Sequence, residues 1–226
     1  MASRGFFRSF VSFELSYERR RDVIGKFDDI VSLGRACQPA YQIRRLLGVQ
    51  AAHVFDWIIT PDTALQALLA TRLDGFFSRD RLIMGPEACV IDALTDVRFL
   101  HEFPPGADLD EKYMEHAPRF RMLTERWRAF MASRRRVLFI RQHAWDADAR
   151  ATARRLRGTL DVVAPLLDYT LLYLTSDDEA PWGEEKIFNR RLHQPEVPDW
   201  RGDDQAWAAL LVEFVPSSTR LFPAQG

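Results

Sequence analysis

Residues 30–48 read IVSLGRACQPAYQIRRLLG. The stretch begins with a short apolar run that ends at Gly34, as a strand does before a tight turn. Apolar residues then recur at helical spacing from Ala40 to Leu47, and Gly48 follows as a stop signal. The stretch therefore predicts a strand, a tight turn and a helix in direct succession.

The rest of the chain repeats this alternation of strand-like and helix-like pieces. Thr60-Pro61-Asp62 supplies an N-cap, a first-turn proline and an early acid for a second helix, which Gly75 ends. Two prolines and a glycine follow closely after His101, so this histidine is expected at the end of a strand. Further strands are expected at roughly 53–59, 88–91, 97–103, 137–140, 169–174 and 187–192, and further helices at roughly 120–130, 149–160 and 207–214.

Alternating elements of this kind predict an α/β fold, with α+β as the variant, in which helices flank a central mixed β-sheet. The chain has 226 residues, 47% of them hydrophobic, and can bury a core without a disulfide or a metal. No Gly/Ser-rich linker or charge block interrupts it before residue 175. A single domain over 1–226 is expected, with an N-terminal extension (1–26), a core (27–175) and a C-terminal segment (176–226).

Charge and cysteine usage exclude several classes of function. The 31 Lys and Arg residues balance 32 Asp and Glu residues, so no net field attracts nucleic acid or an anionic membrane. Two cysteines in the whole chain are typical of a reducing compartment, and a cytoplasmic protein is expected. Since no Cys-x-x-Cys or His-Glu-x-x-His spacing occurs, neither a metal nor another cofactor is expected.

The two ends of the chain are rich in aromatic residues. Charges interrupt the N-terminal stretch, so it offers no signal peptide, and no segment is long enough to span a membrane. Phe6, Phe7, Phe10 and Phe13 fit packing onto the domain, which we favour, or an amphipathic surface anchor. The aromatic residues of the C-terminal segment fit either packing on the core or a surface for a protein partner or a second copy of the chain.

Cys37 is the candidate nucleophile because of its position. A thiol in the first turn of a helix meets the positive end of the helix dipole and free N–H groups, which favour thiolate and can hold an oxyanion. From composition alone, a small buried hydrophobe at a helix start is the favoured interpretation of Cys37, and Cys89 is expected to fill the core. A nucleophilic thiol also needs a base. The sequence offers five histidines for this role: His53, His101, His116, His143 and His193.

Two blocks of sequence, SLGRACQPA at 32–40 and FDW at 55–57, resemble the bacterial DUF1796 family of papain-like cysteine peptidases. The family pattern runs Ser-x-Gly-x-x-Cys-x-x-Ala, a Leu-Arg helix and Pro-Phe-Asp-Trp. A His-Asp-Phe element and an apolar strand ending in arginine follow. HEF at 101–103 and VLFIR at 137–141 stand at these later positions, and the resemblance covers roughly residues 28–175.

The resemblance implies that Cys37 is a nucleophile and His101 its base. The third member of a triad orients the imidazole. Asp56 is the first choice for it, although a structural role in the loop before Trp57 fits equally well. Glu102 is the second choice. It follows His101 directly, and neighbouring strand residues face opposite sides, so the two side chains cannot easily pair. Contacts to substrate or oxyanion are implied for Ser32, Gly34, Trp57 and Arg141.

Three positions depart from the family pattern. Ala36 stands where the family commonly has asparagine before the cysteine, Val54 stands for the proline, and Glu102 stands for the aspartate. Without the asparagine side chain, the backbone N–H of Cys37 would hold the oxyanion. The departures at Ala36 and Glu102 keep a catalytically inactive interaction module open as an alternative.

The expected function is a cysteine hydrolase or acyltransferase, of peptidase or amidase type. Its substrate would be an acyl-containing small molecule or a peptide. The main alternative is a protein that binds a nucleotide sugar or sugar phosphate, as glycosyltransferases do. In that case the turn after the first strand would hold phosphate, with help from Arg44, Arg45 or Arg141.

Overall fold

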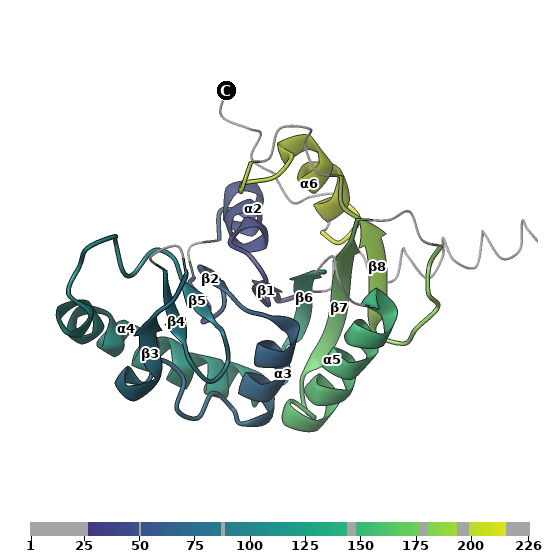
Figure 1. Ribbon diagram of the computed structural model, residues 1–226. Helices are drawn as coiled ribbons and strands as arrows, with labels where there is room; N and C mark the ends of the chain where they lie inside the picture. Colours follow the sequence, from purple (N-terminus) through teal and green to yellow (C-terminus); the bar gives the residue numbers. More distant parts are fainter. Residues whose placement is uncertain are drawn as a thin grey trace, which may run out of the picture.

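The computed structural model of the protein describes residues 27–49, 51–86, 89–143, 148–176, 180–193 and 199–215 (Figure 1). Within these ranges the strands form two four-stranded sheets, one parallel and one antiparallel. The α/β class expected from the sequence is confirmed, with the strands divided between two sheets. The predictions for Phe6, Phe7, Phe10 and Phe13 lie outside the described residues.

The parallel sheet contains the longer strands. Its central strands are apolar along almost their whole length and are buried on both faces, as is typical of parallel sheets. The expected strands at 137–140, 169–174 and 187–192 are confirmed within two residues. In spatial order the strands are β1 (Asp29–Ser32), β6 (Arg136–Gln142), β7 (Asp168–Thr175) and β8 (Ile187–Arg191).

Helices cover both faces of the parallel sheet (Figure 1). Successive side chains of a strand point to opposite faces, so Phe139 of β6 belongs to one apolar cluster and Ile140 to the other. The Phe139 face packs against α3 (Asp62–Ala70) and α5 (Ala149–Val163). The Ile140 face packs against α2 (Gln38–Leu47) and α6 (Asp204–Leu211).

The antiparallel sheet is built from strands of two or three residues. Helix α4 (Leu109–Met131) and a cluster of phenylalanine rings support it. Phe120 of α4 stacks on Phe77 with 4.0 Å between ring centroids, and Phe99 meets Phe120 edge-on at 5.7 Å. The strands lie in the order β2 (Ile58–Ile59), β5 (Arg98–Phe99), β4 (Val90–Asp92) and β3 (Leu82–Met84), and a short 3-10 turn (Arg79–Arg81) precedes β3.

The extended segments expected at 53–59 and 97–103 were predicted too long. Residues 54–57 form a turn in which Asp56 Oδ2 accepts a hydrogen bond from the His53 N–H at 2.8 Å. A side chain that binds nearby backbone in this way competes with strand pairing, so only β2 remains extended. Since β5 ends at Phe99, His101 follows the strand by two residues.

Helix α4 begins well before the expected segment at 120–130. Asp108 caps it by accepting from the Glu111 N–H at 2.8 Å, and acidic residues fill its first turn. Pro118 lies inside the helix and is exposed, so it removes one backbone hydrogen bond without ending the helix. No helix in the described ranges is long and apolar enough to cross a membrane.

Helix α3 also differs from its prediction at both ends. Thr60, expected as the N-cap, lies one residue before the N-cap Pro61 and makes no capping hydrogen bond. The helix ends at Ala70 and not at Gly75, because Arg72 and Leu73 adopt positive φ angles of 53° and 61°.

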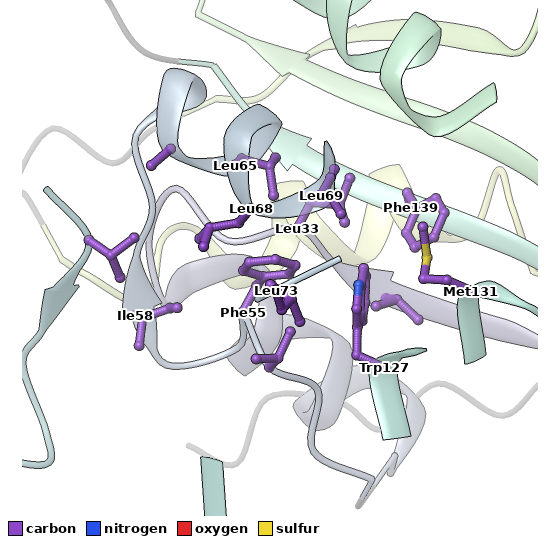
Figure 2. Packing of buried hydrophobic residues seen from close by; sticks show 14 of the residues in the cluster. Leu33, Phe55, Ile58, Leu65, Leu68, Leu69, Leu73, Trp127, Met131 and Phe139 are labelled. Atoms are coloured by element: carbon purple, nitrogen blue, oxygen red, sulfur yellow. The ribbon is translucent and has the colours of Figure 1, made fainter. Parts of the chain in front are cut away.

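Buried aromatic rings join the two sheets (Figure 2). Trp127 of α4 meets Phe55 edge-on with 5.1 Å between centroids and lies 6.1 Å from Phe139 of β6. Leu33 at the end of β1 and Leu69 of α3 pack into the same cluster. The core therefore fixes the loop at 55–57 against the end of β1. Cys37 comes shortly after that strand end in the sequence.

Candidate active site

Cys37 lies at the N-cap of α2, directly after the turn that follows β1. Gly34 and Arg35 in this turn both adopt positive φ, 74° and 79°. These left-handed residues redirect the chain within a few positions, so the strand leads straight into the helix. The Cys37 side chain is 7% exposed at the positive end of α2.

Ser32 and Gly34 shape this turn from inside. A Cβ atom on residue 34 would lie 3.0 Å from Thr60 Oγ1 and 3.2 Å from the Phe55 carbonyl oxygen, which only glycine avoids. The Gly34 N–H donates to Ser32 Oγ at 3.1 Å, and both residues are buried. These two residues therefore shape the turn that leads to Cys37, and both are buried within it.

His101 lies against Cys37, with Nε2 3.4 Å from Sγ. This separation suits a hydrogen bond from the thiol to a ring nitrogen. The thiol comes from the end of the parallel sheet and the exposed imidazole from the loop after β5 of the antiparallel sheet. The other four histidines lie elsewhere: His53 and His116 against the rings of Phe130 and Phe103, His143 against Tyr173, and His193 exposed after β8.

Electrostatics at the site oppose ionisation of the thiol. Burial raises the pKa of Cys37 to about 11, and the carboxylates of Glu102 and Asp56 act in the same direction. The N-terminus of α2 acts in the opposite direction. With a pKa of about 11 the thiol is protonated at neutral pH, and His101 Nε2 lies within hydrogen-bond distance of its sulfur.

Asp56 is occupied by partners other than His101. Its buried Oδ2 accepts from Arg44 Nη2 at 2.9 Å and from the His53 N–H at 2.8 Å. Among the described residues, the only hydrogen-bonding contact of the His101 ring is the one to Cys37. The described geometry is thus that of a dyad.

Glu102 is buried directly beside His101 in the sequence. Its Oε1 forms an ion pair with Arg119 Nη1 at 3.4 Å, while Oε2 has no hydrogen-bond partner among the described residues. His101 is exposed and Glu102 buried, so the two neighbouring side chains lie in different surroundings although neither belongs to a strand.

The chain matches the family model described as "Putative papain-like cysteine peptidase (DUF1796)" over residues 28–156, which is more than half of its length. The chain belongs to the DUF1796 family. The match includes Cys37 and His101 and ends within α5, before the end at 175 expected from the resemblance. The family description supports a cysteine hydrolase in general terms. Comparison with curated proteins and with solved structures gives no match.

In this DUF1796 chain, Trp57 presents its ring edge-on to His101, with 6.1 Å between ring centroids and an interplanar angle of 87°. The Arg44 guanidinium lies 5.4 Å from the centre of the same indole while it holds Asp56. Arg44 belongs to α2, the helix that begins at Cys37. The Arg44–Asp56 ion pair therefore fixes Trp57, and with it the imidazole, relative to the thiol.

Arg141 of β6 is 0% exposed and ties the two sheets together. It donates to the Leu33 carbonyl and to the Thr60 carbonyl, each at 2.8 Å, and forms an ion pair with Asp62 at the start of α3. The structure therefore places Arg141 beneath the turn at 34–37, where its guanidinium supports that turn from below.

Backbone groups beside the thiol offer donors for an oxyanion. Within the described part of the DUF1796 chain, the N–H groups of Arg35, Ala36 and Cys37 donate to no backbone acceptor, whereas the Gly34 N–H is taken by Ser32. Free N–H groups at a helix start are suited to a developing negative charge. No cluster of three His, Cys, Asp or Glu side chains suited to a metal occurs among the described residues.

Arg44 and Arg119 were missed by the sequence analysis as partners of the site carboxylates. Arg44 was treated as a phosphate ligand, although its position seven residues after Cys37 places both on one face of the helix. Arg119 lies just before the helix expected at 120–130. The capping pair Asp108 and Glu111 was the signal that would have placed Arg119 on α4.

Proposed function

We propose that this protein is a cysteine hydrolase in which Cys37 and His101 act as a dyad on an ester, amide or thioester. The observation that carries the proposal is the 3.4 Å separation of Cys37 Sγ and His101 Nε2 at the N-terminus of α2. A thiol, a base in hydrogen-bond reach and free N–H donors are the three parts that acyl transfer through a thioester requires.

In the first half-reaction, His101 Nε2 takes the proton of the Cys37 thiol as Sγ attacks the acyl carbon. The new S–C bond pushes the carbonyl electron pair onto oxygen, where the N–H groups of residues 35–37 stabilise it. The oxyanion collapses and expels the leaving group, which receives the proton from His101. Because Cys37 is protonated at rest, His101 acts as a general base during attack.

In the second half-reaction, water attacks the Cys37 thioester while His101 accepts one of its protons. The second tetrahedral intermediate expels the Cys37 sulfur, which regains a proton from His101, and releases the carboxylic acid. An amine or alcohol in place of water would give the acyltransferase variant of the same chemistry. Identification of the product with and without an added amine distinguishes the two.

Other residues act through this dyad. In the proposal Asp56 and Arg44 are positioning residues that fix Trp57, and Arg141 supports the turn before Cys37. The nucleotide-sugar alternative has less support, because its three arginines are engaged by carboxylates. The pairs are Arg44 with Asp56, Arg45 with Asp204, and Arg141 with Asp62.

Alkylation of Cys37 by iodoacetamide tests the dyad. Rates are measured by mass spectrometry from about pH 5 to about pH 10 in a Cys89→Ser background. We expect His101→Ala to slow alkylation near neutral pH by at least about tenfold, because the base is lost. The remaining reaction should follow the thiolate fraction of Cys37, which burial keeps small near neutral pH.

The matched control is His193→Ala, which removes an exposed histidine away from the thiol and should leave the rate unchanged. Equal rates for wild type and His101→Ala would overturn the dyad and favour the inactive interaction module. Asp56→Ala separates the two roles of Asp56. If Asp56 is a triad member, Asp56→Ala should slow alkylation as much as His101→Ala does. If Asp56 is a positioning residue, Asp56→Ala should slow alkylation no more than Arg44→Ala does.

A further inference from the structure

A segment beyond the family match packs directly on the helix that begins at Cys37. Gln38, the residue after the thiol, donates from Nε2 to the Trp200 carbonyl at 3.4 Å. One turn later Gln42 donates from its buried Nε2 to the Arg201 carbonyl at 2.7 Å. Two glutamines of α2 thus hold the backbone of residues 200–201.

The same segment is fixed at its far end and at its turn. Arg45 of α2 pairs with Asp204 at 3.1 Å and donates to its carbonyl at 3.0 Å. Gly202 adopts a φ of 76° and lies so close to Gln38 that a Cβ atom there would be 2.5 Å from Nε2. These contacts hold residues 200–204 on the first turns of α2.

This anchoring holds an aromatic pair over the first turns of α2, the helix that begins at Cys37. The ring of Trp200 meets the ring of Tyr41 edge-on with 5.2 Å between centroids, yet Trp200 stays 53% exposed. Tyr41 follows Cys37 by one helical turn, and side chains four residues apart on a helix have Cβ atoms about 5–6 Å apart. An exposed indole held against Tyr41 therefore lies within reach of a group bound at Cys37.

We propose that Tyr41 and Trp200 form a subsite for an aromatic group that the substrate carries on the leaving-group side of its reacting carbonyl. The proposal rests on the function proposed for Cys37 and names its substrate class. Aromatic rings offer an aromatic ligand the edge-on and offset contacts that such rings prefer.

Arg201 contributes to the orientation of the indole. Its guanidinium lies 5.4 Å from the Trp200 centroid, so a cation covers part of the ring while the remainder is open to solvent. In the proposal Trp200 determines which substrates bind, and it makes no bond to the reacting atoms.

Binding of N-benzylacetamide tests the subsite without any reaction. In the full chain carrying Cys37→Ala, the indole N–H signal of Trp200 is assigned from its loss in Trp200→Phe, and ligand is titrated by NMR. We expect that signal to shift with N-benzylacetamide and not with N-methylacetamide. Trp200→Ala should weaken binding by about fivefold, and Trp200→Phe should retain most of it. Val212→Ala, which removes an equally exposed apolar side chain of the same segment, should leave binding unchanged.

Alkylation rates distinguish a failed subsite from a failed dyad. The rate with N-benzyl iodoacetamide is divided by the rate with iodoacetamide, and Trp200→Ala should lower this ratio. No Trp200 shift, together with an unchanged ratio, would overturn the subsite whatever the reactivity of Cys37. A Trp200 shift with a thiol indifferent to His101 would retain the subsite and remove the hydrolase.

Discussion

The parallel sheet and the antiparallel sheet differ in the length of their strands and in how those strands are stabilised. Strands β6 and β7 have seven and eight residues, run through the middle of the molecule and are buried on both faces. Strands β2 and β5 have two residues each and depend on the phenylalanine cluster around α4. The first region is stabilised by its own ladder, and the second by side chains packed against it.

The candidate dyad has one member on each region. Cys37 follows β1 of the parallel sheet, and His101 follows β5 of the antiparallel sheet. Their separation therefore depends on the junction between the sheets. Arg141 and the Arg44–Asp56 pair cross that junction. Groups outside the dyad therefore determine the separation of Cys37 and His101, and mutations at the junction test this.

The largest effect is expected for Arg141→Ala. Removing one partner of a buried ion pair leaves Asp62 and two carbonyls without their donor, and should lower the free energy of unfolding by about 4 kcal/mol. Urea denaturation measures this loss. The control is Arg98→Ala, whose ion pair with Asp96 is 42% and 55% exposed, and which should cost less than about 1 kcal/mol. Similar losses for both would show that the junction does not depend on Arg141.

A pH-dependent effect is expected at His53, which packs against the Trp127 and Phe130 rings of α4. Burial, with help from Arg126 and Arg44, lowers the pKa of His53 to about 4. The unfolded chain binds the proton below about pH 6.5 and the folded chain only near pH 4, so stability falls as the pH drops through this window. The full contribution corresponds to about 3 kcal/mol.

Comparison of wild type with His53→Gln isolates this contribution, since the backbone N–H that binds Asp56 is retained. The free energy of unfolding of wild type should fall more steeply between about pH 7 and about pH 4 than that of the variant. Parallel pH profiles would contradict the assignment.

A smaller loss, about 2 kcal/mol, is expected for Gly34→Ala. The new Cβ has both an unfavourable φ and close neighbours from the other region, at Thr60 and Phe55. Gly106→Ala is the matched control, because Gly106 has a φ of 79° but no atom within 4 Å of an added Cβ. The control should cost about 1 kcal/mol from conformation alone. An equal loss of unfolding free energy at both positions would mean that the turn at Gly34 is not closely packed against Thr60 and Phe55.

The smallest predicted effect is a gain in stability. The Thr60 hydroxyl is buried at the junction with no hydrogen-bond partner among the described residues. Thr60→Val removes this unsatisfied group at nearly constant volume, and should raise the free energy of unfolding by about 1 kcal/mol. A loss of stability would show that the hydroxyl is bound in the folded protein.

The sequence predicted the parallel region better than the antiparallel one, for a physical reason. Long apolar runs such as β6 and β7 carry their signal locally, and so does the Gly34 turn before α2. A two-residue strand such as β5 has no period to detect, because tertiary packing determines it. The position of Cys37 at a helix start followed from local sequence, whereas the choice of His101 among five histidines needed the family resemblance.

The pairing of β1 with β6 has a consequence for biosynthesis. Asp28, next to β1, binds Arg136 at the start of β6, and 108 residues separate them. At about 5–20 residues per second, a ribosome needs on the order of 5–20 s to make this intervening chain. During that time β1 has no sheet to join, and the turn that carries Cys37 has no support from Arg141. Closing so long a loop also slows folding. The emerging N-terminal part is therefore the stretch for which a chaperone would matter most.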